Sequence, residues 1–213
     1  NGAQLGTIVG DGNALDVDQE GDFNTLTVGV FEGFDNDVSV TQDGMENISE
    51  VVVLGSGNEF TAKQDGAGND VYLGAISDDS EFEATQIGDY NQAHIVNFIG
   101  MDNDVELTQM GDENVGIIQG AQGVEAPTVG NEIKVTQSGD FNDAFVEYGT
   151  MIDTNYNELT VSQDGDLNSI DMLLEGDMHS VSISQLGNEN MITGAGGAPM
   201  LVGGYGITLN ITQ

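Results

Sequence analysis

Apolar and polar residues alternate along the chain in short runs, and many of these runs end at a glutamine. In the segment DVSVTQ, Val38, Val40 and Gln42 share one side of the alternation, while the residues between them are polar. An alternation with a period of two residues is typical of a β-strand that buries one face. We therefore predict a strand before each such glutamine, whose side chain points inward with the apolar residues.

A second alternation follows each glutamine after a short polar break. Seven, nine and eleven residues past it the side chains are mostly small or apolar, as at Val71 and Leu73 in NDVYLGA. The turn between the two strands has glycine two residues after the glutamine, and the return carries glycine nine and asparagine six residues before the next one. Glycine permits the positive φ angles of a sharp corner, and asparagine tolerates them. Each unit is thus predicted to be strand, turn, strand.

The turn belongs to a motif, QxGxxN, that occurs eight times at steps of 23, 22, 22, 23, 28, 26 and 22 residues. Self-similarity at such a period indicates a stacked repeat architecture. We expect the inward glutamines and asparagines to form ladders and the glycines to form corners. The ladder glutamines are Gln19, Gln42, Gln64, Gln86, Gln109, Gln137, Gln163 and Gln185; the ladder asparagines are Asn24, Asn47, Asn69, Asn91, Asn114, Asn142, Asn168 and Asn190; the corner glycines are Gly21, Gly44, Gly66, Gly88, Gly111, Gly139, Gly165 and Gly187.

One unit is too small to fold alone. Burying its four or five inward apolar side chains contributes roughly 6–15 kcal/mol, whereas ordering about 22 backbone residues costs about 1–2 kcal/mol each. Stability therefore requires identical units stacked about 4.8 Å apart, so that each glutamine amide bonds to the next. The predicted fold is all-β: an amyloid-like β-solenoid of about nine rungs, with two parallel, in-register sheets face to face.

We interpret residues 1–213 as a single solenoid with half-repeats at both ends. The strand pattern at Leu209, Ile211 and Gln213 is not followed by its turn, while residues 1–10 read as the second strand of a unit. These complementary halves predict head-to-tail polymerisation of the chain with itself. The repeats start near Asn13, Asn36, Asn58, Ser80, Asn103, Asn131, Asn157 and His179.

The chain is strongly acidic, with 2 Lys and Arg against 37 Asp and Glu and a formal net charge of −35. This charge excludes nucleic acids and anionic membranes as electrostatic partners and favours cations. No apolar run approaches the roughly 18 residues of a membrane-spanning helix, so no membrane insertion is expected. There is no cysteine, and residue 1 is Asn rather than Met. We expect an exported, mature form that uses neither disulfides nor redox chemistry.

Stacking would bring acidic residues of the turns into a row. Asp89, Asp112, Asp140 and Asp166 each lie three residues after a ladder glutamine. Unit charges about 4.8 Å apart repel by roughly 0.9 kcal/mol even in water, so assembly must recruit counter-cations. A specific Ca²⁺ site and a diffuse counterion atmosphere both remain open, and the diffuse atmosphere is favoured because the chain has no calcium-loop motif.

The repeat, with small residues such as Ala93 and Ala144 two positions after the asparagine, resembles the curlin repeat of bacterial curli over roughly residues 13–192. This resemblance implies a structural subunit of an extracellular functional-amyloid fibre in the biofilm matrix, with a role in adhesion and no enzymatic activity. It also implies a nucleator and a secretion pore as partners. Here asparagine usually replaces the serine six residues before the glutamine, and an apolar residue usually replaces a second glutamine eleven residues after it. These departures leave open whether the chain is a major subunit or a nucleator.

Other functions have weaker support in the sequence. We assign no catalytic, cofactor-binding or metal-binding residues, because the carboxylates fall at outward and corner positions and neither His94 nor His179 has an evident partner. Outward Thr and Ser beside the glutamines raise an ice-binding solenoid, but Lys63 and Glu106 interrupt that surface. A monomeric calcium-dependent adhesin is the remaining alternative, and capped ends would distinguish it.

Three long connections, at residues 119–131, 148–157 and 194–206, interrupt the repeat. We expect all three at the corner that precedes a glutamine strand, so that they protrude from one edge of the solenoid. Loops of this kind are often merely tolerated. Contact between fibres or with the matrix is the functional alternative.

Overall fold

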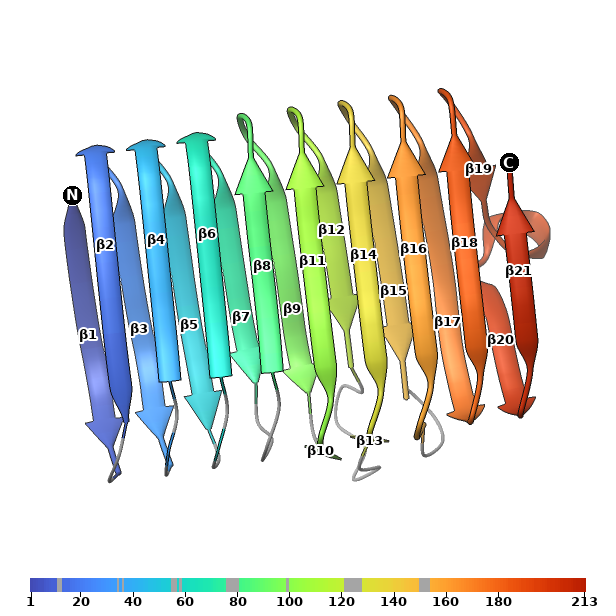
Figure 1. Cartoon of the computed structure of the whole chain (residues 1–213), viewed down its shortest axis with the longest axis horizontal. Coiled ribbons are helices and arrows are strands. Elements are labelled where there is room, and N and C mark those ends of the chain that lie inside the picture. The colour runs from blue at the N-terminus through green and yellow to red at the C-terminus, as the bar shows by residue number, and fades with distance from the viewer. Residues whose placement is uncertain are drawn as a thin grey trace.

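In the computed structural model, two parallel β-sheets lie face to face and the chain passes back and forth between them (Figure 1). The structure describes residues 1–10, 13–33, 35, 37–54, 57, 59–75, 81–98, 100–120, 128–149 and 154–213. The colours of Figure 1 run in chain order along the stack, so each unit of sequence adds one step. This arrangement confirms the predicted all-β solenoid of two parallel sheets.

We call the sheet that carries the ladder glutamines the Gln sheet and its partner the facing sheet. The nine strands of the Gln sheet are β2 (Ala14–Asp22), β4 (Asp37–Met45), β6 (Glu59–Ala67), β8 (Glu81–Ile87), β11 (Asp104–Met110), β14 (Glu132–Ser138), β16 (Glu158–Asp164), β18 (Ser180–Leu186) and β21 (Thr208–Thr212). The ten strands of the facing sheet are β1 (Gly2–Val9), β3 (Thr25–Glu32), β5 (Ile48–Leu54), β7 (Asp70–Ala75), β9 (Gln92–Phe98), β12 (Val115–Gln119), β15 (Asp143–Tyr148), β17 (Ser169–Asp177), β19 (Met191–Ile192) and β20 (Met200–Tyr205). Two short strands, β10 (Gly100–Met101) and β13 (Thr128–Val129), pair with each other, and η1 (Ala195–Gly197) is a 3₁₀ turn.

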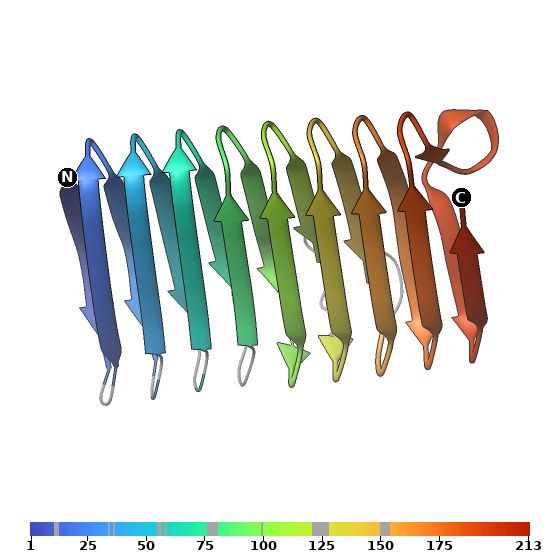
Figure 2. The ribbon, with the colours of Figure 1, turned by 45° about the horizontal axis from the view of Figure 1, so that its top comes forward.

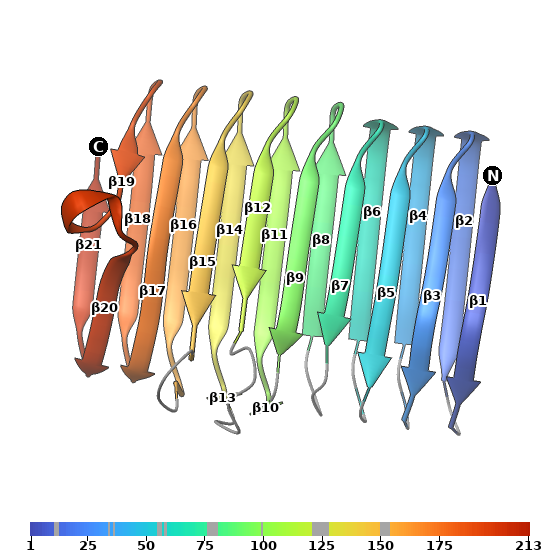
Figure 3. The same cartoon turned by 180° about the vertical axis from the view of Figure 1, so that it is seen from behind.

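Strands of the Gln sheet pair in register, with glutamine beside glutamine. The long connections between repeats do not change this register. Gln109 and Gln137 are 28 residues apart, yet they occupy paired positions of β11 and β14. The extra residues are therefore accommodated outside the strands. The facing sheet, seen from behind in Figure 3, is less regular, with register shifts between Val28 and Val30 and between Gly74 and Ala75.

Inward side chains from both sheets fill the space between them. On β11, Val105 and Leu107 are 0% exposed, in step with the alternation predicted from the sequence. Large side chains of one sheet lie opposite small residues of the other. Opposite Leu107 the chain has Gly116, where an added Cβ would lie 2.7 Å from the Leu107 Cδ1 atom. A small residue in one sheet thus makes room for a large side chain of the other, as close packing of the core requires.

The solenoid has slightly fewer complete turns than the nine or so rungs expected from the sequence. In the part of the chain that the structure describes, β1 and β21 are single strands at the two ends, and complete strand–turn–strand units lie between them. The half-units at the ends do not close a turn of the coil. Among the described residues, no helix is long and apolar enough to cross a membrane.

The third long connection does not lie at the corner where the sequence places it. Strand β20 returns to the facing sheet, where Met200 pairs with Met172 and Val202 pairs with Leu174. The insertion therefore interrupts a strand of the facing sheet, between β19 and β20, and its loop with η1 is visible beside the last strands in Figure 2. The alternation of Met200 and Val202 explains the return, because it buries Val202 in the core.

Some positions named from the sequence lie outside the described residues. They are Asn36, Asn58 and Ser80 at the starts of repeats, and residues 121–127 and 150–153 in the first two long connections.

Candidate functional site: side-chain ladders and open strand edges

The ladder glutamines form a continuous series of side-chain hydrogen bonds through the stack. Each Nε2 donates to the Oε1 of the glutamine in the next strand, at 2.6 to 3.0 Å from Gln19 to Gln185 and at 3.4 Å from Gln185 to Gln213. Nε2 also donates across the core to the facing sheet, as from Gln109 to the carbonyl oxygen of Gln92 at 2.9 Å. From Gln42 to Gln185 these side chains are 0% exposed. The amides therefore join neighbouring units and also join the two sheets.

The ladder asparagines form a second series that runs in the opposite direction. From Asn69 to Asn190, each Nδ2 donates to the Oδ1 of the preceding asparagine at 2.9 to 3.1 Å. The same oxygen accepts the backbone N–H of the following asparagine, as between Asn69 and Asn91 at 3.0 Å. Asn24 and Asn47 differ, because their Nδ2 groups donate to backbone carbonyls of the turns. This ladder thus ties each turn to its neighbours.

Each corner glycine before the last lies close to the corner glycine of the next unit. At Gly111 φ is 115°, and an added Cβ would lie 2.2 Å from the carbonyl oxygen of Gly139. Gly187, in the last turn, has a φ of 103°, but an added Cβ would meet only the Asn190 side chain at 3.9 Å. Glycine is therefore required at Gly111 for two reasons, its φ angle and the approach of a second backbone.

Two residues after each corner glycine the backbone adopts a left-handed conformation, which the sequence analysis missed. Phe23, Tyr90 and Phe141 have φ of 60°, 58° and 56°, and their side chains are 74%, 60% and 50% exposed. Bulky residues rarely adopt this conformation. The glycine at Gly68 is the feature of the sequence that could have predicted this conformation. Gly68 occupies the same column with a φ of 69° and lies against the ring of Tyr90.

A second asparagine column, at the edge of the solenoid opposite the corner glycines, includes a buried histidine. The Nδ2 of Asn157 donates to the Oδ1 of Asn131 at 2.9 Å. In the next unit His179 takes this place: its Nδ1 accepts the backbone N–H of Ile207 at 3.1 Å, and its Nε2 lies 2.9 Å from the carbonyl oxygen of Glu175. Both ring nitrogens are thus used in holding the corner together.

The aspartate row is tied into the turns by hydrogen bonds. Asp112, Asp140 and Asp166 each accept, through Oδ1, the backbone N–H of the preceding aspartate in the row, at 2.9 to 3.0 Å. Asn188 continues the row by accepting the N–H of Asp166 at 2.9 Å. An amide oxygen can therefore make the same bond as the carboxylates. Within the described ranges, no group of three or more His, Cys, Asp and Glu side chains is placed to hold a metal ion.

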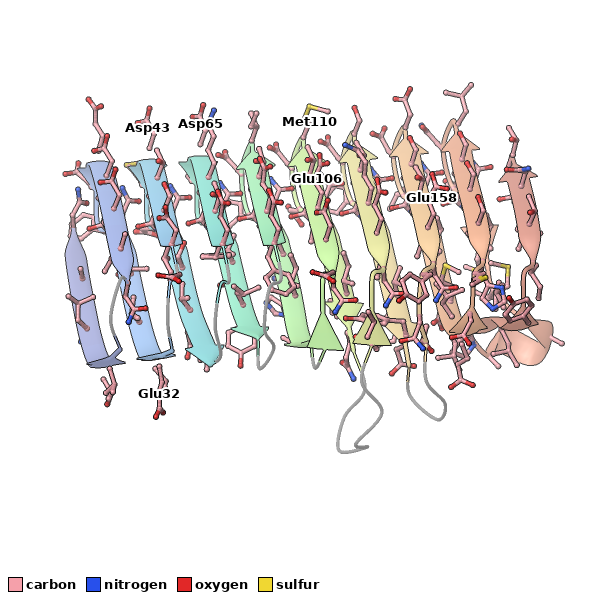
Figure 4. The ribbon with its side chains drawn as sticks, turned by 60° about the horizontal axis from the view of Figure 1, so that its bottom comes forward. Glu32, Asp43, Asp65, Glu106, Met110 and Glu158 are labelled. Atoms are coloured by element: carbon pink, nitrogen blue, oxygen red, sulfur yellow. The ribbon has the colours of Figure 1, made fainter. Side chains whose placement is uncertain are left out.

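The outer face of the Gln sheet carries a longer acidic column that the sequence analysis also missed. Six consecutive strands place a carboxylate at the same level, five residues before the ladder glutamine: Asp37, Glu59, Glu81, Asp104, Glu132 and Glu158. Figure 4 shows Glu106 and Glu158 on this face, Asp43, Asp65 and Met110 at the turn edge, and Glu32 at the opposite edge. The constant offset from the glutamine was the available signal.

Burial and neighbouring carboxylates raise the pKa of two carboxyl groups in this column. The Asp104 carboxylate is the largest cause of the raised pKa of Glu81, followed by burial and by further acidic neighbours. Burial, and then the Glu106 carboxylate, raise the pKa of Asp104, while the Lys134 ammonium lowers it in part. Lys134 forms an ion pair with Glu106, the one ion pair among the described residues, and so relieves the repulsion at that place on the face.

We expect the solenoid to become more stable as the pH falls from 7 to about 4, the ordinary pKa of a carboxyl group. Since the folded-state pKa values of Glu81 and Asp104 are raised, their stabilising contribution is fully present below the ordinary carboxyl pKa and is lost as the pH rises through the raised values. The gain should not exceed about 1 kcal/mol, because solvent screens these groups. Thermal unfolding at the two pH values measures it. The double variant Glu81→Gln, Asp104→Asn should be more stable at pH 7 and less sensitive to pH; an unchanged pH dependence would contradict the role of the column.

The two ends of the Gln sheet leave matching core positions partly uncovered. Leu15 and Val17 on β2, and Leu209 and Ile211 on β21, pack against the core but are only partly buried. Their counterparts in the interior strands are at most 2% exposed. In the part of the chain that the structure describes, each end of the Gln sheet therefore has a strand edge without a paired strand, together with the ends of the apolar columns.

The described surface also has a shallow hollow of about 430 Å³ next to the turn edge. It is lined by Tyr90, Gln92, Glu113 and Val115. These four side chains include no nucleophile with an adjacent general base, so the hollow does not support a catalytic site.

Comparison with known families identifies a repeat family that matches the chain. The family model described as "Curlin associated repeat" matches residues 10–44, 33–66, 77–111 and 154–193, which together cover more than half of the chain. No curated protein matches the chain. The matched segments include every ladder glutamine except Gln137, and the ladder asparagines Asn24, Asn47, Asn91, Asn168 and Asn190.

Proposed function

The chain belongs to the curlin-repeat family, and on this premise we propose that it is a structural subunit of a curli-like amyloid fibre in which copies stack head to tail. Members of the family are structural, non-enzymatic, extracellular curli subunits. A place at the cell surface or in the biofilm matrix, and a role in adhesion, are part of the proposal. A nucleator and a secretion pore would be its further partners.

The observation that carries the proposal is the match between the two ends of the Gln sheet. The ladder starts with the Oε1 of Gln19 and finishes with the Nε2 of Gln213, so the last glutamine of one copy could donate to the first of the next. In the same register, Ile211 would lie over Val17 and Leu209 over Leu15. Such a contact joins different surfaces of two copies and propagates as a filament.

The acidic surface supports a role for counter-cations in this assembly. Stacking copies continues the aspartate row and adds acidic groups of one copy beside those of the next. We propose that cations screen these rows in a diffuse atmosphere, because the Oδ1 atoms of the aspartate row are already engaged by backbone N–H groups.

The substitution Ile211→Asp should slow seeded fibre elongation by at least about tenfold, because stacking would bury a carboxylate without a partner. The matched control is Asn210→Asp, which adds the same charge to the neighbouring, outward position of β21. Elongation is measured by light scattering and the products are viewed by electron microscopy. We expect Asn210→Asp to elongate nearly as fast as the wild type.

Two results would contradict this proposal in different ways. If both variants elongate at the wild-type rate, fibres form but β21 does not make the contact. If the wild-type chain remains a stable monomer at high concentration, even after seeding, the fibre function itself is wrong.

A further inference from the structure

The outer face of the Gln sheet and the outer face of the facing sheet carry different kinds of side chain. On the Gln sheet, the outward positions one, three and five residues before each ladder glutamine are Asp, Glu, Lys, Ser, Thr or Asn, with Ala14 as the exception in β2. On the facing sheet the outward positions include many apolar side chains. These are Ile48, Val52, Tyr72, Val96, Val115, Ile117, Phe145, Leu173, Met191 and Leu201.

The centre of the facing sheet carries a continuous stripe of large side chains. Tyr72, His94, Ile117 and Phe145 occupy paired positions on β7, β9, β12 and β15. All four are half-buried by their neighbours. The rings of Tyr72 and His94 meet edge to face, with centroids 6.0 Å apart and planes at 82°. We call these four residues the stripe; their mutual packing means that little side-chain freedom is left to lose on binding.

We propose that the stripe is the centre of a lateral interface, in which two copies of this chain pair with their facing sheets against each other. The pairing deepens the proposed function, since it would join neighbouring fibres, but it does not depend on stacking, because two single copies present the same face.

The charge distribution favours this occupant. The three outward columns of the facing sheet that are level with Asp70, Tyr72 and Gly74 contain five carboxylates and no lysine: Glu50, Asp70, Asp143, Glu147 and Asp171. Glu32, Glu175 and Asp177 lie beyond these columns, at the ends of β3 and β17. Those of the Gln sheet contain ten carboxylates and two lysines: Asp16, Asp18, Asp37, Glu59, Glu81, Glu83, Asp104, Glu106, Glu132 and Glu158, with Lys63 and Lys134. A cationic partner would therefore prefer the Gln sheet. The facing sheet instead suits a partner whose contact surface carries little charge at its centre.

The spacing of the stripe also points to a second copy. Its side chains repeat at the strand separation of about 4.8 Å, and paired sheets with the same repeat interdigitate such rows about 10 Å apart. A partner without this repeat could match only part of the stripe. At both ends the stripe meets a carboxylate, Glu50 on β5 and Asp171 on β17, so the run of large side chains in this column is limited to the four stripe residues.

The area of the face is sufficient for a specific contact. Three outward columns span about 17 Å along the strands. The strands occupy nine positions across the sheet, because β19 and β20 share one, and these span about 40 Å, so each copy would contribute about 700 Å². Specific interfaces typically bury about 800 Å² on each partner.

The test compares Ile117→Glu with Thr108→Glu, each combined with Ile211→Asp to suppress stacking. Ile117 and Thr108 point outward from the same unit, on the facing sheet and the Gln sheet respectively, so both variants add one carboxylate. Sedimentation velocity at physiological salt measures the dissociation constant of the pair. We expect Ile117→Glu to raise it by at least about tenfold and Thr108→Glu to leave it nearly unchanged. Without Ile211→Asp, fibres of the Ile117→Glu variant should be one solenoid thick by electron microscopy, and wild-type fibres should be two solenoids thick.

Several results would overturn the pairing. It fails if the Ile211→Asp chain stays a single copy at all concentrations, in which case a different molecule would have to cover the stripe. It also fails if Thr108→Glu weakens pairing as much as Ile117→Glu does, since general repulsion would then explain the loss. Wild-type fibres that are one solenoid thick would contradict it while leaving the fibre function intact.

Discussion

Replacing Gln109 with glutamate should destabilise the solenoid by about 3–5 kcal/mol at neutral pH. The change keeps the size of the side chain, but an ionised carboxylate cannot donate to Gln137 Oε1 or to the carbonyl of Gln92. It would face both oxygens in a position that is 0% exposed. The loss is larger than that of an ordinary hydrogen bond because the new charge is buried among acceptors.

Chemical denaturation of the non-stacking Ile211→Asp chain, with and without Gln109→Glu, measures this effect. The control is Thr108→Glu, which places the same acid on the outward side of the same strand and should cost less than about 1 kcal/mol. Part of the loss should be recovered below about pH 5, where a protonated glutamate can donate one hydrogen bond again. Equal destabilisation by the two variants would show that the ladder amide is not specifically needed.

The substitution Gly111→Val should destabilise the stack by at least about 3 kcal/mol and slow assembly correspondingly. A β-branched side chain resists the φ of 115°, and its Cβ would lie 2.2 Å from the carbonyl oxygen of Gly139. The neighbouring unit must therefore move away, which also stretches the hydrogen bond from the Gly139 N–H to Met110 O.

Two controls separate the causes of that loss. Gly187→Val introduces the same strain at a φ of 103°, but no carbonyl of a next unit lies within 4 Å of its Cβ in a single copy, so its effect should be smaller. Thr108→Ser, an outward substitution on β11, should change little. Denaturation midpoints and assembly rates are compared across all three variants. If Gly111→Val and Thr108→Ser behave alike, the corner does not require glycine.

Periodicity in the sequence was sufficient to predict the two sheets and the inward side of each strand. Val105, Leu107 and Gln109 alternate with polar residues, and only one face of a strand can enter a core that both sheets share. The motif offsets also place residues of different units at equal height, which is why Gln109 and Gln137 could be expected to meet despite an insertion. What the pattern cannot supply is the direction of each amide, because donor and acceptor are chosen by the carbonyls nearby.

The features that were missed depend on contacts between units or on the outward residues. The left-handed turn residues, such as Tyr90, follow from the path of the turn and not from their own preferences, since an aromatic residue gives no hint of a φ of 58°. The third long connection was misplaced because its length was visible but the return of Met200 to the facing sheet was not. The acidic column and the stripe lie at outward positions, and the alternation of apolar residues predicts only which residues point inward.

The opposite directions of the two ladders have a consequence for long assemblies. Side-chain amides carry dipoles, and the glutamines direct the positive N–H end of each dipole towards the C-terminal end of the stack. The asparagines direct theirs towards the N-terminal end. A single ladder would accumulate an electric moment with every added copy, as aligned peptide units do in a helix. From Asn69 to Asn190 the asparagine ladder opposes the glutamine ladder, which offsets part of the moment that each unit adds, so the field met by an incoming copy at the tip grows less with the length already assembled.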